Sequence, residues 1–146
     1  MRRVSRAEVR VNGCKTGEIG KGLLVYLGVE EGDGPADFQW LIHKILGMRI
    51  FDDGEGRMNE SLSDREGIML ISQFTLFGNV KKGFRPSFNR AAQPDKAKAV
   101  FNESLVELKA QFKGEVASGV FGSHMDIDAI DDGPVSIWLD SRQKGY

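Results

Sequence analysis

The sequence predicts an α/β domain. Two segments that begin at Pro35 and Pro94 show helical periodicity, whereas most of the remaining apolar residues fall in short runs typical of strands. The chain has 146 residues, the length of one domain, and 40% of them are hydrophobic, enough for a single packed core. We therefore expect a single α/β domain over residues 1–146 with two main helices.

The first part of the chain is interpreted as a hairpin followed by a buried strand. Valines between positions 4 and 11 precede the turn signal Asn12-Gly13, which predicts a strand entering a hairpin with a short return strand around 18–20. The apolar run 23–29 is typical of a strand that is covered on both faces.

The first helix is expected to begin at Pro35, with Asp37 adding negative charge to its first turn. Its apolar positions recur every three or four residues: Phe38, Leu41, Ile42, Ile45 and Leu46. Residues 48–51 are interpreted as another strand. The acidic loop 52–56 lacks the full ligand pattern of a calcium loop and is interpreted as a polar turn.

The second half is expected to contain a buried strand, a helix and three further strands. The strand at 68–71 leads directly into Ser72-Gln73-Phe74-Thr75-Leu76, so these side chains can face a cleft. Pro94 opens the second helix, which ends before Gly114. The last strands are predicted over 115–121, 125–130 and 135–139, with a turn at 131–134 between the last two.

Charge and composition limit the kinds of partner that we expect. The net charge is −1, from 20 basic and 21 acidic residues, so any RNA contact must be local. The best candidate is the segment 81–90, with four cations and two aromatic rings. A solvated loop with its rings in the core is the alternative. One cysteine, no apolar stretch near the roughly 20 residues of a membrane span and no leader pattern predict a cytoplasmic protein.

Ordinary catalytic motifs are missing from the sequence. There is no nucleophile elbow, no phosphate-binding loop with its lysine and no cluster with zinc-ligand spacing. His43 and His124 are interpreted as a helix-surface residue and a turn residue, although either could have a chemical role. Cys14 has no obvious base beside it and is interpreted as an inert thiol.

Two separated motifs resemble those of the D-aminoacyl-tRNA deacylases, homodimeric enzymes that remove D-amino acids from tRNA. Residues 72–76 match the family's Ser-Gln-Phe-Thr-Leu box at every position. The family's Asn-x-Gly-Pro-x-Thr box corresponds to residues 131–136, where Asp131 replaces the Asn and Ser136 the Thr. Further segments match in family order over nearly the whole chain. The resemblance implies a three-layer β/β/α fold with a barrel-like sheet.

The resemblance also implies the chemistry. Ser72, Gln73, Phe74 and Thr75 would form the catalytic box, and the substrate's own terminal ribose hydroxyl would help to activate water, with no cofactor or metal. Thr75 as a nucleophile stays open, although no base lies beside it in the sequence. The partners would be D-aminoacyl-tRNA and a second copy of the chain, with active sites at the subunit interface and no membrane.

Chiral selectivity would come from the Gly133-Pro134 segment. A cis bond there would present two neighbouring carbonyls on one side, which an L-side chain would strike. Arg3 matches a family arginine that braces this segment. The alternatives are a plain Gly-Pro turn and a surface cation.

Four residues would bind the end of the tRNA. Phe121 and Met125 resemble residues that line the pocket for the terminal adenosine, and core packing is the alternative for both. Lys82 and Arg85 are expected to contact the tRNA end. Asp131 in place of an amide removes two donors and adds charge near a phosphate-rich ligand.

Two functions from different classes therefore stay open. One is hydrolysis of D-aminoacyl-tRNA, with action on glycyl-tRNA undecided. The other is a non-catalytic protein of the same fold that binds RNA ends. A general thioester or peptide hydrolase would have only Thr75 and Cys14 to support it.

Overall fold

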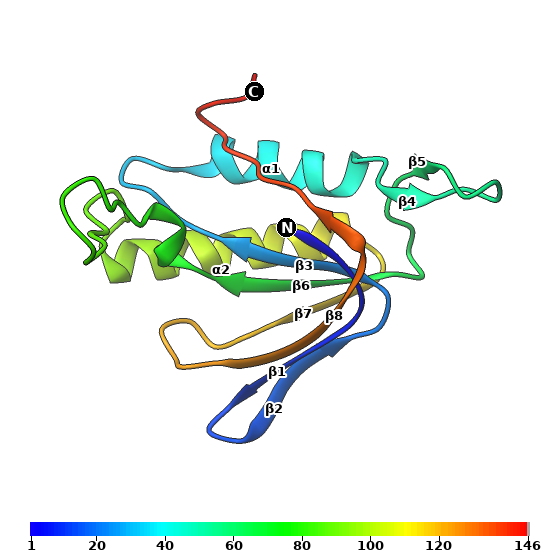
Figure 1. Cartoon of the computed structure of the whole chain (residues 1–146), viewed down its shortest axis with the longest axis horizontal. Coiled ribbons are helices and arrows are strands. Elements are labelled where there is room, and N and C mark those ends of the chain that lie inside the picture. The colour runs from blue at the N-terminus through cyan, green and yellow to red at the C-terminus, as the bar shows by residue number, and fades with distance from the viewer. Residues whose placement is uncertain (146) are drawn as a thin grey trace.

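The strand and turn signals at the start of the chain form the predicted hairpin, and its first strand organises the sheet. In the computed structural model, which describes residues 1–145, β1 (Arg2–Val11) pairs with β2 (Cys14–Ile19) along its second half and with β3 (Gly22–Leu27) at its beginning. The other edge of β1 pairs antiparallel with β8 (Asp126–Ser136), as Figure 1 shows. β1 therefore joins its two successors in the chain to the far C-terminal strand β8.

The central strands are parallel, which accounts for their continuous apolar sequences. β3 is parallel to β6 (Gly67–Ser72), and β6 is parallel to β7 (Glu115–Ser118). Strands in parallel pairs are usually covered on both faces, so both sets of alternating side chains are apolar. The prediction of buried strands at 23–29 and 68–71 is confirmed, with β3 ending at Leu27.

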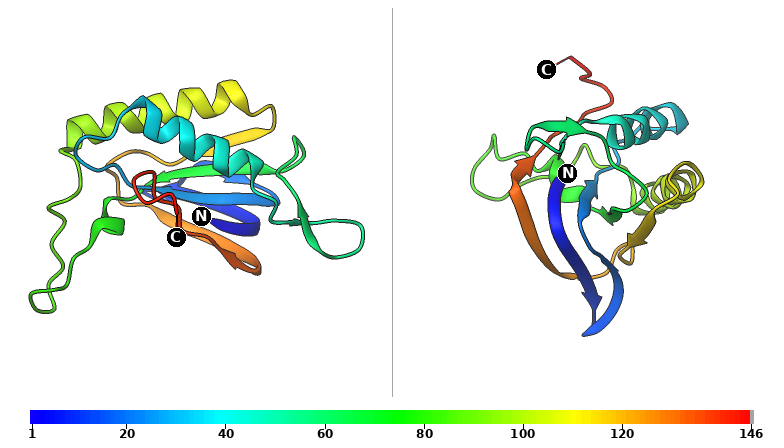
Figure 2. Two further views of the ribbon diagram at one scale, coloured as in Figure 1. Left: turned by 90° about the horizontal axis from the view of Figure 1, so that it is seen from above. Right: turned by 90° about the vertical axis from the view of Figure 1, so that its right-hand side faces the viewer.

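Two hydrophobic cores lie on opposite faces of β3 and β6. Leu23 and Ile68 belong to the core beneath the helices, whereas the next residues, Leu24 and Met69, belong to the core enclosed by the curved sheet. Figure 2 shows both helices on one side of the sheet, with β1, β2 and β8 curling over the other side. The fold is the expected β/β/α arrangement, and the sheet nearly closes into a barrel where β2 lies against β7.

Both predicted helices are present and begin at their prolines. They are α1 (Pro35–Gly47) and α2 (Pro94–Gln111). Their buried residues fall at helical spacing and face the sheet: Phe38, Ile42 and Ile45 in α1, and Phe101, Ser104 and Leu108 in α2. No helix within residues 1–145 is long and apolar enough to cross a membrane.

The strand predicted over 48–51 is largely wrong. Only β4 (Phe51–Asp52) is extended, and it pairs with β5 (Met58–Glu60) in a separate two-stranded ribbon, outside the main sheet. Apolar residues in this run are buried beside the helix-facing core without joining a ladder. β7 is also shorter than predicted, because the chain turns after Ser118.

The strands predicted over 125–130 and 135–139 are joined in one strand, which ends at Ser136, so residues 137–139 lie outside it. β8 runs through the Gly133-Pro134 segment that the sequence had suggested as a turn. Proline removes a backbone donor, but the β1–β8 register is interrupted here: residues 132–135 have no partner on β1, and β8 pairs with no other strand. The motif is therefore held on an edge strand.

Candidate active site

The residues of the first box lie where β6 ends and the chain turns. Ser72 is the last residue of β6, and η1 (Phe74–Phe77), a short 3-10 helix absent from the sequence prediction, follows it. The backbone N–H of Gln73 donates to the Leu27 carbonyl (2.8 Å), which ties the start of the turn to β3. The side-chain amide of Gln73 donates to the Thr75 hydroxyl. The box thus has a defined local geometry.

A cavity of about 670 Å³ opens beside this box. Its walls contain five of the residues proposed from the sequence: Ser72, Gln73, Phe74, Phe121 and Met125. The exposed Thr75 belongs to the adjoining turn and is not among the lining residues. The structure therefore brings the box together with the two residues expected at the terminal adenosine, from segments about fifty positions apart in the chain.

Phe121 and Met125 are half-buried: each side chain lines the pocket on one side and packs against the hydrophobic core on the other. The Phe121 ring lies 5.9 Å from the ring of Phe101 on α2. The Met125 sulfur lies only 2.3 Å from the position that a Cβ on Gly119 would take, so a side chain at 119 would displace it. Packing from behind thus fixes both side chains at the cavity wall.

His124 is a lining residue that the sequence analysis did not select. It is the only ionisable side chain among the described residues that line the cavity. Its side chain is 92% exposed, and Nε2 lies 3.6 Å from a carboxylate oxygen of Asp126. Its position between Phe121 and Met125 in the sequence was the available signal. His43 lies exposed on α1, as predicted.

The cavity offers aromatic and polar groups, and its walls carry no carboxylate. A Ser-His-Asp arrangement therefore cannot be assembled from the described lining residues alone. Within residues 1–145, no three His, Cys, Asp or Glu side chains gather in a way that could hold a metal ion. The arrangement is suited to stacking a base, orienting a polar substrate and donating hydrogen bonds.

The second box lies elsewhere in the same chain. Gly133 and Pro134 are exposed on β8, are joined by a cis peptide bond, and are not among the residues that line the cavity. Arg3 is not a surface cation, because only 5% of it is exposed. Its guanidinium donates to the carbonyls of Asp132 (3.1 Å) and Ile50 (2.7 Å) and so grips the residue just before the Gly-Pro pair.

The altered position Asp131 has an ionic partner. Arg2 donates to its two carboxylate oxygens at 2.9 and 2.7 Å, across the β1–β8 pairing. This ion pair compensates the negative charge that replaces the family's amide. Ser136, the other altered position, lies opposite Arg2 in the ladder.

The loop between η1 and α2 carries exposed cations around an exposed ring. Lys82 and Arg85 form no ion pair within residues 1–145, and the Phe84 side chain between them is fully exposed. Phe88, by contrast, is half-buried and lies edge-on against Phe74 at 5.1 Å. One ring is thus available to a partner, and the other is part of the cavity wall.

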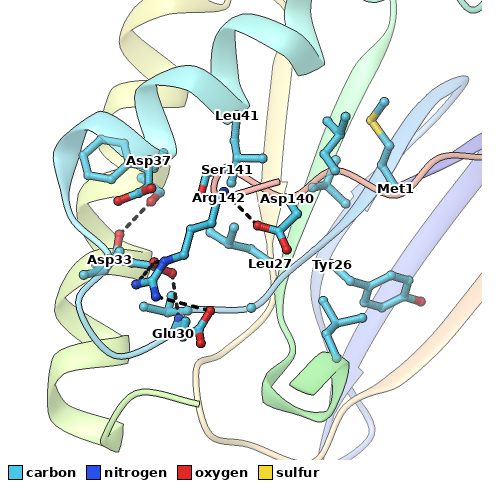
Figure 3. Close-up of a pocket in the computed structure, with 18 of the residues that line it drawn as sticks. Met1, Tyr26, Leu27, Glu30, Asp33, Asp37, Leu41, Asp140, Ser141 and Arg142 are labelled. Atoms are coloured by element: carbon cyan, nitrogen blue, oxygen red, sulfur yellow. Dashed lines mark hydrogen bonds and ion pairs between the residues drawn. The ribbon is translucent and has the colours of Figure 1, made fainter. Parts of the chain in front are cut away.

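A smaller pocket of about 140 Å³ lies between α1, the end of β3 and the C-terminal segment (Figure 3). Charged residues such as Asp33, Asp37 and Arg142 surround its mouth, above apolar walls. None of the residues predicted from the sequence to act in catalysis or binding lines it. The candidate active site is therefore the larger cavity.

Known proteins resemble this chain over nearly its whole length. The family model described as D-Tyr-tRNA(Tyr) deacylase matches residues 1–140. A curated relative from Chromobacterium violaceum, named D-aminoacyl-tRNA deacylase, is 50% identical over 143 residues, covering 97% of this chain and 95% of the relative. A solved structure described as c-Myc DNA Unwinding Element Binding Protein has a TM-score of 0.88 at 34% identity, covering 95% of each chain. Another, described as a probable eukaryotic D-amino acid tRNA deacylase, shares the fold with a TM-score of 0.74 at 18% identity, covering 91% of this chain and 92% of that chain.

Proposed function

This chain belongs to the D-Tyr-tRNA(Tyr) deacylase family, and we propose that it hydrolyses the ester bond of D-aminoacyl-tRNA, releasing the free D-amino acid and the tRNA. The observation that carries the proposal is the single cavity that joins Ser72, Gln73 and Phe74 to Phe121 and Met125. One wall suits the ester, and the other suits the terminal adenosine.

The cavity wall and the neighbouring loop bind different parts of the tRNA end. Phe121 and Met125 present a ring and a soft thioether to the adenine base. Lys82 and Arg85 supply cations for phosphates of the acceptor end, with the exposed Phe84 ring between them for an unpaired base. Because the net charge is only −1, this local group of cations carries the electrostatic attraction to RNA.

The chemistry relies on position more than on a protein nucleophile. A water attacks the ester carbonyl, the bond to the ribose oxygen breaks, and that oxygen leaves with a proton while the acid is released. The neighbouring ribose hydroxyl of the substrate orients the water and relays a proton: it accepts one from the water and passes its own to the leaving ribose oxygen. Orientation alone contributes up to about 7–11 kcal/mol in well-aligned reactions, and one backbone N–H at the developing oxyanion about 3 kcal/mol. Because an aminoacyl ester is already activated, its hydrolysis needs little further lowering of the barrier.

Selectivity is assigned to a Gly133-Pro134 pair that enters the cavity from a second copy of the chain. Both residues are exposed, the cavity of their own chain does not include them, and Arg3 fixes the carbonyl that precedes them. Backbone carbonyls facing the α-carbon leave room for hydrogen but not for an L-side chain. Glycine has no side chain to reject, so glycyl-tRNA is also a candidate substrate. The working form is a homodimer, and the cytoplasm, where charged tRNA is found, is its expected location.

A release assay separates this function from binding without catalysis. Purified protein is incubated with D-tyrosyl-tRNA without added metal, and free D-tyrosine and bound tRNA are measured in parallel. Multiple turnovers support the deacylase. Binding of the tRNA end with no release would instead support the non-catalytic alternative, in which the changes at Asp131 and Ser136 have cost activity. Activity lost to a chelator and restored by zinc would contradict the metal-free chemistry.

A further inference from the structure

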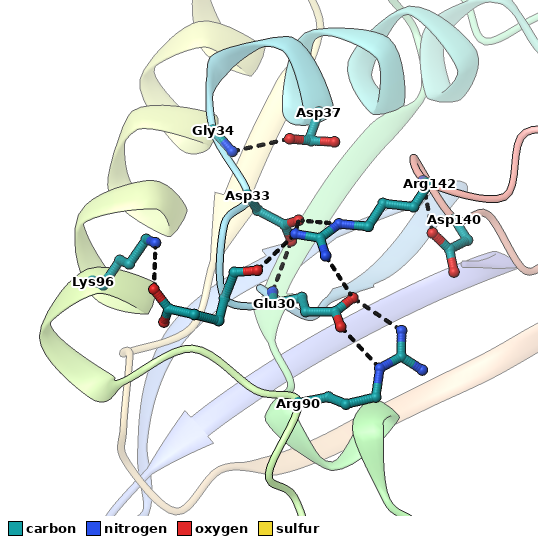
Figure 4. A network of polar contacts seen from close by, with 9 residues as sticks. Glu30, Asp33, Gly34, Asp37, Arg90, Lys96, Asp140 and Arg142 are labelled. Carbon is teal, nitrogen blue, oxygen red and sulfur yellow. Dashed lines mark hydrogen bonds and ion pairs between the residues drawn. The ribbon is translucent and has the colours of Figure 1, made fainter.

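A network of ion pairs lies behind the candidate active site, at the point where β3 ends. The Glu30 carboxylate accepts two hydrogen bonds from the Arg90 guanidinium, both at 2.9 Å. Arg142, from the C-terminal segment, donates to Asp33 at 2.8 Å and to the Glu31 carbonyl at 2.7 Å. Figure 4 shows the guanidinium groups of Arg90 and Arg142 converging on Glu30 from opposite sides.

Arg90 links this network to the catalytic box. Its guanidinium carbon lies 5.6 Å from the centroid of the Phe77 ring, over the ring face. Phe77 is the last residue of η1, the turn that contains Thr75. The guanidinium is therefore fixed on one side by two hydrogen bonds and contacts the end of the catalytic turn on the other.

Gly28, the residue that follows β3, leaves no space for the Phe77 ring to move toward it. A Cβ on Gly28 would lie 2.8 Å from a carbon of the Phe77 ring and 3.2 Å from the Gln73 carbonyl oxygen. Both ends of the turn, the Gln73 carbonyl and the Phe77 ring, therefore lie close to Gly28. The backbone bond from Gln73 to Leu27 anchors its start, whereas the ring stacked beneath Arg90 anchors its end.

We propose that the Glu30–Arg90 pair is a positioning device for the catalytic turn: it holds the Phe77 ring against Gly28 and so sets where Gln73 lies at the cavity and where Thr75 lies in the adjoining turn. The effect on catalysis rests on the proposed deacylase function, whereas the effect on the turn does not. Glu30 and Arg90 are positioning residues, since neither lines the larger cavity.

The pair can be altered without removing the local fold. Backbone hydrogen bonds already join these segments, from Glu31 N–H to the Arg90 carbonyl (3.3 Å) and from Ala92 N–H to the Val29 carbonyl (2.9 Å). The Arg90 side chain is 56% exposed, so its truncation opens no cavity in the core. A matched control lies next to this pair: Lys96 on α2 pairs with Glu31 at 2.8 Å, and no hydrogen bond or ion pair among the described residues joins Lys96 to η1.

The test compares Arg90→Ala, Glu30→Gln and the control Lys96→Gln in the full-length protein. Hydrogen exchange is measured at the amides of Gln73 and Gly78, the latter bonded to the Thr75 carbonyl. Arg90→Ala and Glu30→Gln are expected to speed exchange of the Gly78 amide by about tenfold or more, whereas the control leaves it unchanged. This arm decides the positioning claim even if the wild-type protein releases no amino acid.

Kinetics with D-tyrosyl-tRNA form the second arm. Misplacement of a catalytic group lowers kcat by about 10- to 100-fold with KM changed less than about threefold. The exchanged pair Glu30→Arg with Arg90→Glu restores the ion pair but places a carboxylate over the Phe77 ring, so kcat is expected to stay low. Unchanged exchange in Arg90→Ala would overturn the proposal. A raised KM with unchanged kcat would also overturn it, because Arg90 would then act by binding RNA.

Discussion

Arg2 and Arg3 are neighbours on β1, yet their environments are opposite. Arg2 lies at the surface in an ion pair with Asp131, with about a third of its side chain exposed. Arg3 is buried and donates to two backbone carbonyls and to the Asp52 carboxylate. The sequence identified Arg3 through its family resemblance and could not show its burial, because its partners Ile50, Asp52 and Asp132 come from distant segments.

We predict that Arg3→Met lowers the free energy of unfolding by about 2–3 kcal/mol, since it leaves a buried carbonyl without its donor. Arg2→Met, the matched control, is expected to cost about 0–1 kcal/mol, as exposed ion pairs do. Urea unfolding of both variants checks this. If both variants lose the same free energy of unfolding, the hydrogen bonds of Arg3 beside the Gly-Pro segment contribute no more to stability than the exposed ion pair of Arg2.

Thr75 is the residue most easily mistaken for a nucleophile. Its hydroxyl accepts a hydrogen bond from Gln73, and no carboxylate lines the adjoining cavity. Thr75→Ala is therefore expected to keep deacylation within about tenfold of wild type, whereas loss of a true nucleophile costs about 10³-fold or more. In single-turnover assays, tRNA ending in 2′-deoxyadenosine should instead react about 100-fold more slowly. A trapped acyl-enzyme on Thr75 would contradict this mechanism.

Among the helices and strands, local sequence signals predicted both helices and the central strands well. Errors arose in segments whose structure depends on which strand they pair with. Proline at the first helical position and apolar spacing define α1 and α2 without reference to the rest of the fold. Residues 48–51 are apolar because the run is buried, not because it forms a strand of the main sheet. β8 can include a proline because this strand lies at the edge of the sheet. Neither fact can be obtained from periodicity.

The start of α1 makes stability depend on pH. Asp37 accepts a hydrogen bond from the Gly34 N–H (3.0 Å), which holds the pKa of its carboxyl below the ordinary value. A lowered pKa stabilises the folded state above the unfolded-state pKa of about 3.9, and this stability is lost as pH falls through the lower folded-state pKa.

We therefore predict that Asp37→Asn lowers the free energy of unfolding by about 0.5–1 kcal/mol at neutral pH, and by almost nothing near pH 2. Asp95→Asn, in the first turn of α2, is the control, because Asp95 makes no side-chain hydrogen bond among the described residues. Its effect should be smaller at neutral pH. A constant difference across the pH range would exclude this role for Asp37.

At the scale of the whole molecule, the two family motifs lie apart. The first box lines the large cavity, whereas Gly133 and Pro134 lie exposed on β8 and do not reach the cavity of their own chain. The sequence identifies both motifs, and the family resemblance implied that they meet at a subunit interface. Under the proposed function, a site that uses both motifs joins two copies of the chain.

Mixed dimers test that arrangement. One variant carries Phe121→Ala with Met125→Ala and should lose binding of the tRNA end. The other carries Gly133→Ala with Pro134→Ala and should hydrolyse both enantiomers. In purified mixed dimers the one intact pocket faces the intact Gly-Pro pair of the other subunit, so about half of the wild-type activity should remain and should be selective for D-tyrosyl-tRNA. Hydrolysis of both enantiomers by dimers shown to be mixed by mass would contradict a site shared between subunits.

The ratio of kcat/KM for D-tyrosyl-tRNA to that for L-tyrosyl-tRNA measures the chiral filter itself. Rejection by fixed backbone carbonyls excludes the L-side chain by a clash of several kcal/mol, so we expect a ratio of about 100 or more for the wild-type protein. Equal hydrolysis of the two enantiomers would contradict this expectation, since a cavity that accepts both has no chiral filter.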